Sequence, residues 1–274
     1  MKKEYYGAKP PNKVNTWLEE KLEELRILGY TVIDDVVSKE ALVEVRQRLD
    51  AVYEEQKREV QPEFTLDQIQ EENQVRAPLC YDDLFVELAT KESVTEVLSK
   101  VLGDYYVIHL QIGIINVPCT ENRQSIWHRD LLFSDFVISS PLAISAMLCI
   151  DDFNKESGGT FVVPFSHSEE QMPSEQFVEK YGVTIEAKAG SVFLMDSMLI
   201  HKAGYNSSQN VRRGLNTIYS TGLLKQQISL SAMMDGKHAE DPFLNVLLGY
   251  DANPSENVLE WRKRRYNKLS PEGK

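Results

Sequence analysis

A block of short strand candidates constrains the fold of this chain most. From Tyr105 onward, runs of β-branched and aromatic residues alternate with Gly, Pro, Ser, Asn and Asp. About eight strand candidates follow one another over roughly 115 residues, with no long helix between them. The segments are "YYVIHLQIGIINVPC", "SIWHRD", "PLAISAMLCID", "GTFVVPFS", "VTIEAKAGSVFLMDS" and "RRGLNTIYSTG". We therefore expect a mainly β fold with helical flanks and a double-stranded β-helix (jelly-roll, cupin-like) core.

Helical patterns flank this block on both sides. Residues 13–28 carry apolar side chains at helical spacing, Gly29 ends that pattern, and Ser38 can cap a second helix. Residues 57–77 are polar and lack a period, which indicates a loop or an irregular insert. No repeat or clear linker is present. We expect a single domain over residues 1–274, with a helical region at about 13–104, the jelly-roll core at about 105–225 and a helical tail at about 240–268.

Charge and cysteine content narrow the class of protein. The formal net charge is -12, which disfavours a nucleic-acid partner because phosphate contacts need clustered Lys and Arg. The one basic cluster, Arg262 to Arg265, is interpreted as a solvated helix face. Three widely separated cysteines indicate free thiols in a reducing compartment. The start lacks an apolar signal segment, and the longest apolar stretch is too short to span a membrane. We expect a cytoplasmic protein with no membrane partner.

One histidine and carboxylate pair stands inside the strand block. The chain has 5 His and 42 acidic residues, so chance gives roughly one His-x-acid triplet. On a strand, residues two apart point to the same side, so His128 and Asp130 can face one point with Trp127 on the opposite face. His201 follows a predicted strand-turn-strand stretch and is the best third ligand. Together the three residues would form a 2-His-1-carboxylate triad, which holds Fe(II) and leaves positions open.

The remaining histidines are weaker candidates. His167 precedes Glu169 in "PFSHSEE", which is typical of a turn after a strand, and a solvated loop is the favoured interpretation. His238 precedes Glu240 in a polar loop with no histidine after it. His109 has no acid two residues on and is interpreted as a core residue.

Two arginines begin the strand candidate that follows His201. An open Fe(II) site needs a reductant, and many such sites use 2-oxoglutarate, whose far carboxylate binds a fixed guanidinium. Arg212 and Arg213 are adjacent, so one should point into the barrel and the other outward. The alternative is that both are surface charges.

At this point the chain resembles the phytanoyl-CoA dioxygenase family of Fe(II)/2-oxoglutarate oxygenases over roughly residues 25–225. The resemblance lies in "ILGYTVIDDVVSKEALVEVRQRL", "WHRD", "DDFNKESGGTFVVPFSHS" and "AGSVFLMDSMLIHKAGYNSSQNVRRGLNTIYS". It implies that the iron ligands are His128, Asp130 and His201, that Arg212 binds 2-oxoglutarate, and that Gln111 is a weaker candidate for its other end. Two positions depart from the family pattern: Ala203 stands where a polar residue often contacts the co-substrate, and Phe165 replaces a turn glycine.

The resemblance implies an enzyme that uses Fe(II), 2-oxoglutarate and O2 to hydroxylate a small molecule, with succinate and CO2 as co-products. Desaturation or ring closure stays open, and so do a non-catalytic jelly-roll binding protein and a hydrolytic zinc site. Candidate substrate contacts are Phe133, Phe136 and Met147 for apolar groups, and Arg76 or Arg123 for an anionic group.

Overall fold

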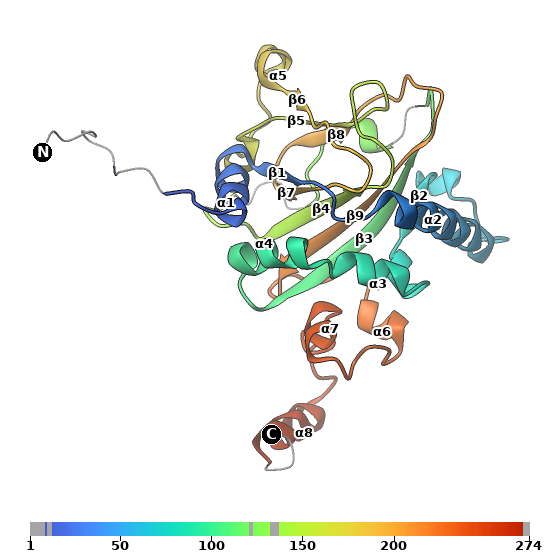
Figure 1. Ribbon diagram of the computed structural model, residues 1–274. Coiled ribbons are helices and arrows are strands. Elements are labelled where there is room, and N and C mark those ends of the chain that lie inside the picture. Colours follow the sequence, from blue (N-terminus) through green and yellow to red (C-terminus); the bar gives the residue numbers. More distant parts are fainter. Residues whose placement is uncertain (1–8, 10–12, 121–122, 132–136, 271–274) are drawn as a thin grey trace, which may run out of the picture.

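The chain folds around two antiparallel sheets, as a jelly roll requires. The computed structural model describes residues 9, 13–120, 123–131 and 137–270. The larger sheet has the strand order β1-β7-β4-β9-β3-β2 and the smaller has the order β6-β5-β8 (Figure 1). The strands are β1 (Tyr30–Ile33), β2 (Gln74–Arg76), β3 (Tyr106–Asn116), β4 (Ala143–Cys149), β5 (Thr160–Val162), β6 (Val183–Thr184), β7 (Val192–Asp196), β8 (His201–Ala203) and β9 (Arg212–Thr221). The predicted jelly-roll core is therefore confirmed.

One apolar core lies between the two sheets. It combines Met147 of β4 and Phe193 of β7 from the large sheet with Val162 of β5 from the small one. All three side chains are buried. Because both sheets contribute to this core, neither strand layer can separate without exposing it to water.

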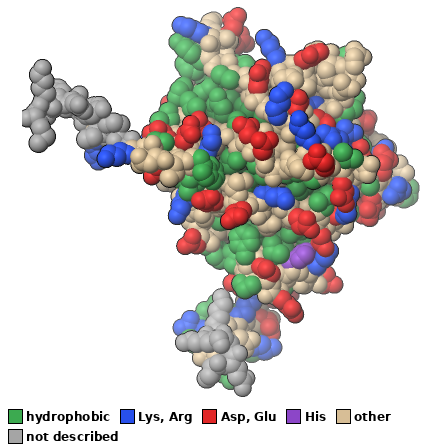
Figure 2. Space-filling model, in the orientation of Figure 1, with side chains coloured by type: hydrophobic (Ala, Val, Ile, Leu, Met, Phe, Trp, Pro, Cys, Tyr) green, Lys and Arg blue, Asp and Glu red, His purple; other side chains and the backbone are tan. Residues whose placement is uncertain are grey.

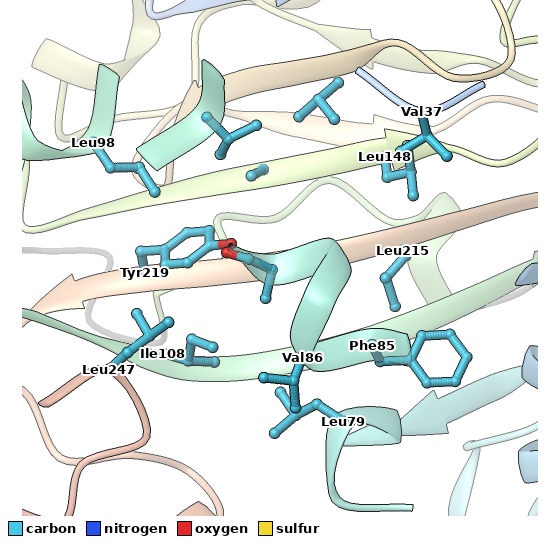
Figure 3. Close-up of a cluster of buried hydrophobic side chains, with 14 of the residues drawn as sticks. Val37, Leu79, Phe85, Val86, Leu98, Ile108, Leu148, Leu215, Tyr219 and Leu247 are labelled. Carbon is cyan, nitrogen blue, oxygen red and sulfur yellow. Dashed lines mark hydrogen bonds between the residues drawn. The ribbon is translucent and has the colours of Figure 1, made fainter. Parts of the chain in front are cut away.

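Helices cover the other face of the large sheet. They are α1 (Trp17–Leu28), α2 (Lys39–Glu59), α3 (Leu84–Ala89), α4 (Glu92–Leu102), α6 (Leu230–Met234) and α7 (Pro242–Leu247). Figure 3 shows part of this layer, where Leu215 and Tyr219 of the sheet face Val86 and Leu98 of the helices. The Tyr219 hydroxyl donates to the Ala89 carbonyl at 2.6 Å, so the ring fills the core and its polar end has a partner.

The first two helices begin and end where their sequence signals predict. Thr16 and Glu19 form a capping box at the start of α1, and Gly29 ends it in the left-handed region at φ 84°. The Ser38 side chain accepts from Ala41 N at the start of α2.

Two segments differ from their predicted structure. The insert at 57–77 is partly regular, because α2 continues to Glu59 and β2 pairs with β3, with Arg76 opposite Ile112. Three residues are too few to give a periodic pattern, so this strand has no sequence signal. The stretch "SIWHRD" is not a strand. A 3-10 turn, η3 (Arg123–Ser125), precedes His128, which pairs with His201 only as an isolated bridge.

Outside the two layers, α5 (Glu175–Tyr181) borders the small sheet and α8 (Val258–Leu269) lies apart from the body (Figure 1). Acidic and basic side chains are interspersed over the visible face (Figure 2). None of the described helices has the length and apolar character that crossing a membrane requires.

Candidate metal centre and co-substrate pocket

His128, Asp130 and His201 converge on one point at the mouth of the jelly roll. One ligand atom from each lies within 4.8 Å of the other two. Asp130 Oδ1 lies 4.0 Å from His128 Nε2 and 3.6 Å from His201 Nε2. The two imidazole rings are 4.3 Å apart between centroids. The fold therefore brings together the three side chains that the sequence predicts as metal ligands.

Backbone pairing fixes the two histidines relative to each other. His128 N donates to His201 O at 3.0 Å, and His201 N donates to His128 O at 3.1 Å. Asp130 N donates to Ser197 O at 3.0 Å, which holds the carboxylate end of the segment. Arg129 points to the other side and donates to the Glu169 and Ser166 carbonyls. An isolated bridge with these anchors is enough to place the ligands, even though no regular strand forms.

Hydrogen bonds at the far ring nitrogens set the histidine tautomers. His128 Nδ1 lies 2.7 Å from Ile126 O, and His201 Nδ1 lies 2.9 Å from Leu199 O. A carbonyl only accepts, so each Nδ1 carries the proton and each Nε2 presents a lone pair to the shared point. This orientation is the one that metal-binding histidines adopt.

Asp130 is held with one oxygen turned to the histidines. Its Oδ2 accepts from Ser145 Oγ at 2.5 Å and from Asn216 Nδ2 at 3.1 Å. Burial by itself would raise the pKa of Asp130, but the nearby histidines and these two hydrogen bonds outweigh it and lower the pKa. The carboxylate is therefore ionised, and Oδ1 is the oxygen left to bind a cation.

His201 sits deeper than His128, with 4 % of its surface exposed. Burial lowers the pKa of His201 to about 4, against the opposing effect of Asp130. The ring is therefore neutral near pH 7, which is the form that binds a metal.

Arg212 is the largest buried cation of the described residues, and its charge has no carboxylate partner among them. It is 2 % exposed. Its Nη2 donates to Gly158 O at 2.7 Å, and the guanidinium lies 4.3 Å from the Phe153 ring centroid. Nε has no hydrogen bond. Burial lowers the pKa of Arg212 to about 10, so it remains cationic near neutral pH. A cation buried in this way is costly unless an anion binds there.

Arg213 points the other way, as the sequence predicts for one member of the pair. Its guanidinium binds Asp50 through Nε and Nη2 at 2.9 Å each, and Asp151 lies 3.6 Å from Nη1. These contacts join β9 to helix α2. Arg213 therefore stabilises the contact between the large sheet and the helix layer, and Arg212 is the member of the pair that faces the interior of the jelly roll.

Gln111 requires a correction. Its side chain is fully buried and faces the helix layer, not the metal centre. Oε1 accepts from Leu79 N at 3.1 Å, and Nε2 donates to Phe85 O and Thr217 Oγ1, also at 3.1 Å. Since both ends of the amide are engaged there, Gln111 is not placed to contact a co-substrate.

The other histidines do not belong to the group of possible metal ligands. His109 is buried at a bulge in β3, and burial lowers its pKa against the opposing effect of the nearby Asp130 carboxylate. His167 lies in the 3-10 turn η4 (Ser166–Ser168), beside Gly29. His238 Nε2 contacts Asp83 at 2.9 Å in a loop. Phe165, the departure at the turn, adopts the left-handed region at φ 69°, and Ala203 ends β8.

Ser145 and Asn216 are site residues that sequence reasoning missed. Each binds the Asp130 oxygen that faces away from the histidines. A signal for Asn216 was available, because it lies four residues after Arg212 on one strand and therefore on the same face. Ser145 lies within a wholly buried strand and carries no such signal.

A cavity of about 380 Å³ opens beside the ligands. Leu110, Ile112 and Ile218 supply aliphatic wall next to His128 and Asp130. Of the substrate contacts expected from the sequence, Arg76 lines this cavity and Met147 lies in the core between the sheets. Phe133, Phe136 and the side chain of Arg123 lie outside the described residues.

The donor set tests which metal the site suits. Two imidazole nitrogens and one carboxylate oxygen on one side of a point leave the remaining coordination positions open, which is the arrangement typical of non-haem Fe(II) oxygenases. Each ligand side chain also has a hydrogen-bond partner that orients it: Ile126 O for His128, Ser145 Oγ for Asp130 and Leu199 O for His201. The donor types and their convergence on one point therefore fit an iron ion.

Comparison with known proteins gives relatives in bacteria and fungi. The chain is 30% identical over 267 residues to an uncharacterized protein of Mycobacterium tuberculosis, covering 93% of this chain and 96% of that one. It is 26% identical to the dioxygenase swnH2 of Arthroderma benhamiae, covering 81% and 77% of the two chains. Among solved structures, EctD from S. alaskensis superposes with a TM-score of 0.63 at 18% identity, covering 74% of this chain and 76% of that chain.

One protein-family pattern matches most of the residues, roughly 25–225, over which the sequence already resembles an oxygenase family. The phytanoyl-CoA dioxygenase (PhyH) pattern matches residues 26–214, which include β1, all three candidate ligands and Arg212. The epimerase SnoN from nogalamycin biosynthesis shares the fold with a TM-score of 0.53 at 20% identity, covering 75% of this chain and 83% of that chain. The chain belongs to the phytanoyl-CoA dioxygenase family.

Proposed function

We propose that this protein is an Fe(II)- and 2-oxoglutarate-dependent oxygenase acting on a small molecule. His128, Asp130 and His201 hold the iron, and Arg212 binds the far carboxylate of 2-oxoglutarate. The observation that carries the proposal is the buried, uncompensated Arg212 on the strand that also supports Asp130 through Asn216. About 13 Å of strand separates the Cα atoms of Arg212 and Asn216, a span that the arginine side chain and a five-carbon diacid can bridge together.

Iron and 2-oxoglutarate, bound by these residues, would supply the activation of O2, with one oxygen atom going to succinate as CO2 is released and the other oxidising the substrate. The protein's own residues orient and neutralise these partners. Asp130 is fixed by Ser145 and Asn216 so that one oxygen faces the iron position. The histidines are fixed as Nδ1–H tautomers with Nε2 directed inward. Pre-orientation of this kind removes the reorganisation that would otherwise oppose binding and reaction.

Hydroxylation is the proposed outcome, with desaturation or ring closure as the alternative. The position of the substrate hydrogen relative to the iron decides between them, and the ligands do not. The presence of Asp130 argues against halogenation, because a halide would need the coordination position that the carboxylate fills. The solved neighbours support small-molecule chemistry: the EctD structure contains 2-oxoglutarate and 5-hydroxyectoine, and a SnoN structure contains Fe3+, alpha ketoglutarate and nogalamycin RO.

Two other functions compete with this proposal. A non-catalytic jelly-roll binding protein would tolerate loss of a ligand, whereas all three are present with their supporting hydrogen bonds. A hydrolytic zinc site could use the same ligands, but it would give Arg212 no anion to bind. The buried guanidinium therefore favours the oxygenase.

Anaerobic titration of the metal-free protein with Fe(II) and then 2-oxoglutarate tests the proposal by visible absorption. We expect a weak charge-transfer band that needs both additions in the wild type. His201→Ala should remove the band, and Arg212→Ala should shift its appearance to far higher 2-oxoglutarate concentrations. Arg213→Ala is the matched control, since it removes the neighbouring guanidinium on the opposite face of β9. A folded wild-type protein with no band would support the binding protein instead.

A further inference from the structure

One buried turn contacts two of the three metal ligands. Residues 197–199 follow strand β7, and the chain then continues to His201. The Ser197 carbonyl accepts from Asp130 N at 3.0 Å, and the Leu199 carbonyl lies 2.9 Å from His201 Nδ1. A displacement of this turn would therefore move a carboxylate ligand and an imidazole ligand together.

The same turn holds the side chain of Asp130 through two hydroxyl groups. Ser145 Oγ donates its one proton to Asp130 Oδ2 at 2.5 Å, so it accepts from Ser197 Oγ at 2.8 Å. Ser145 and Ser197 are both fully buried. The direction of these hydrogen bonds is therefore fixed by the carboxylate at one end and by the turn at the other.

Asp196, the last residue of β7, closes the turn. Its Oδ1 atom accepts from Met198 N at 2.9 Å, and its carbonyl accepts from Leu199 N at 2.8 Å. An aspartate oxygen bound to the N–H two residues on fixes the backbone of a turn. The N–H of Asp196 also donates to the Gly29 carbonyl at 2.9 Å, which ties the turn to the end of α1.

Asp196 is a buried acid that does not belong to the group of possible metal ligands. It is 5 % exposed, and burial raises the pKa of its carboxyl against the opposing effects of the Met198 N–H, His167 and Arg129. Burial of an acid costs free energy, so its place calls for a role. Protonated or ionised, the carboxyl keeps an oxygen that accepts from Met198 N, so closure of the turn does not depend on its charge.

We propose that Asp196 is a positioning residue of the metal centre. By closing the turn, it places Ser197 to hold Asp130 and Leu199 to hold His201. It acts through the turn and supplies no ligand atom itself. This inference rests on the proposed function, because the placement of these ligands matters only if a metal binds between them.

Titration of the metal-free protein with Co(II) alone tests the proposal, because the visible bands of bound Co(II) change with the geometry of its ligands. Asp196→Ala should weaken Co(II) binding by about 10- to 100-fold and alter the bands at saturation, since a group that orients a ligand is lost. Asp196→Asn keeps an acceptor for Met198 N and should stay within about threefold of the wild type. Ser197→Ala removes only the hydroxyl and should weaken binding by about three- to tenfold.

Asp82→Ala is the matched control. Asp82 Oδ1 accepts from Leu84 N at 2.9 Å at the start of α3, so this variant loses the same kind of bond to the N–H two residues on. Its Co(II) affinity should equal that of the wild type, and urea unfolding of each variant measures the accompanying loss of stability. Equal weakening of Co(II) binding in Asp82→Ala and Asp196→Ala would show a general effect of instability and would overturn the proposal.

Two further results would overturn it. One is an Asp196→Ala affinity within about twofold of the wild type, and the other is an Asp196→Asn affinity as low as that of Asp196→Ala. If Asp196→Ala does not fold, Ser197→Ala decides, and an affinity within about twofold of the wild type then overturns the proposal. Failure of the wild type to bind Co(II) at all would instead count against the proposed function.

Discussion

At the scale of single residues, the direction in which a side chain points distinguishes a residue of the candidate site from one that only stabilises the fold. Arg212 and Arg213 are adjacent and chemically identical, yet the first is buried with no carboxylate partner among the described residues and the second binds Asp50 and Asp151 on the helix side. Strand alternation predicted that division from the sequence alone. Gln111 was a candidate only through the family resemblance, and alternation with its neighbours Leu110 and Ile112, which line the cavity, turns its side chain to the helix layer.

The two arginines give the first prediction. Arg212→Lys should raise the 2-oxoglutarate concentration needed for half-saturation by about a hundredfold, since a lysine cannot reproduce the bidentate, stacked contact of a guanidinium. Arg213→Lys should leave that concentration unchanged and cost at most about 1 kcal/mol of stability, as expected for a partly exposed ion pair. Anaerobic 2-oxoglutarate titrations and urea unfolding measure the two effects. Equal losses of 2-oxoglutarate binding in both variants would contradict the assignment.

The cysteines give a second prediction. Burial raises the pKa of Cys80 to about 11 and raises that of Cys149 as well, whereas Cys119 is exposed. Only the thiolate reacts, so at pH 8 Cys80 would be ionised in roughly one molecule in a thousand. Iodoacetamide should therefore label the native protein at Cys119 alone and the unfolded protein at all three positions. Mass spectrometry reads this out, and rapid native labelling of Cys149 would show that the strand is not buried as described.

At the scale of elements, strand β9 connects the metal centre to the helix layer through its two faces. Asn216 supports Asp130 on one face, and the adjacent Thr217 accepts from Gln111 on the other. The residue types Asn and Thr alone predict neither the contact with Asp130 nor the contact with Gln111. The first two ligands could be predicted because His128 and Asp130 are two residues apart, whereas the supports of Asp130 come from β4, 15 residues on, and from β9, 86 residues on. Long-range pairing is the information that a single sequence lacks.

The opposite faces of β9 give a third prediction. Asn216→Ala should weaken Fe(II) affinity by about 10- to 100-fold, because residues that orient a ligand commonly carry that much. Thr217→Val should cost about 1 kcal/mol of stability through its lost hydrogen bond and leave Fe(II) affinity unchanged. Anaerobic Fe(II) titration distinguishes the two variants. An unchanged affinity in Asn216→Ala would show that Asp130 needs no support from β9.

Helix α2 gives a fourth prediction, on packing. Leu49 is fully buried against the sheet, where the site of a Cβ on Gly113 would lie only 2.5 Å from its Cδ1 atom. Leu49→Ala should lower the free energy of unfolding by about 2–5 kcal/mol. Val43→Ala, on the exposed side of the same helix, should change it by less than about 0.5 kcal/mol. Urea unfolding followed by circular dichroism compares them, and similar values for the two would mean that α2 does not pack as described.

At the scale of the whole molecule, the helical flanks and the jelly roll form one body. Strand β1, from the N-terminal region, pairs with β7 of the large sheet, and a single apolar cluster joins the helices to that sheet. We therefore propose that the chain is one domain, which is also the prediction from the lack of a linker in the sequence. Helix α8 is the exception, because its apolar residues Val258, Trp261 and Tyr266 are exposed.

This arrangement gives a fifth prediction. The protein should unfold in one cooperative transition that includes the N-terminal helices and the sheets. Deleting residues 255–274 should shift the midpoint by no more than a few degrees and leave the iron and 2-oxoglutarate absorption band intact, since no described side chain of α8 belongs to the core cluster. Differential scanning calorimetry measures the number of transitions and the midpoint, and the anaerobic titration measures the absorption band. Two separate transitions in the full chain would contradict a single domain.

The central claim is that iron and 2-oxoglutarate bind together between the triad and Arg212. The most direct measurement is a crystal structure of the protein grown anaerobically with both. The account predicts iron bound to His128 Nε2, Asp130 Oδ1 and His201 Nε2, with the far carboxylate of 2-oxoglutarate against the Arg212 guanidinium and no contact to Gln111. Iron held by other residues, or 2-oxoglutarate bound away from Arg212, would contradict it.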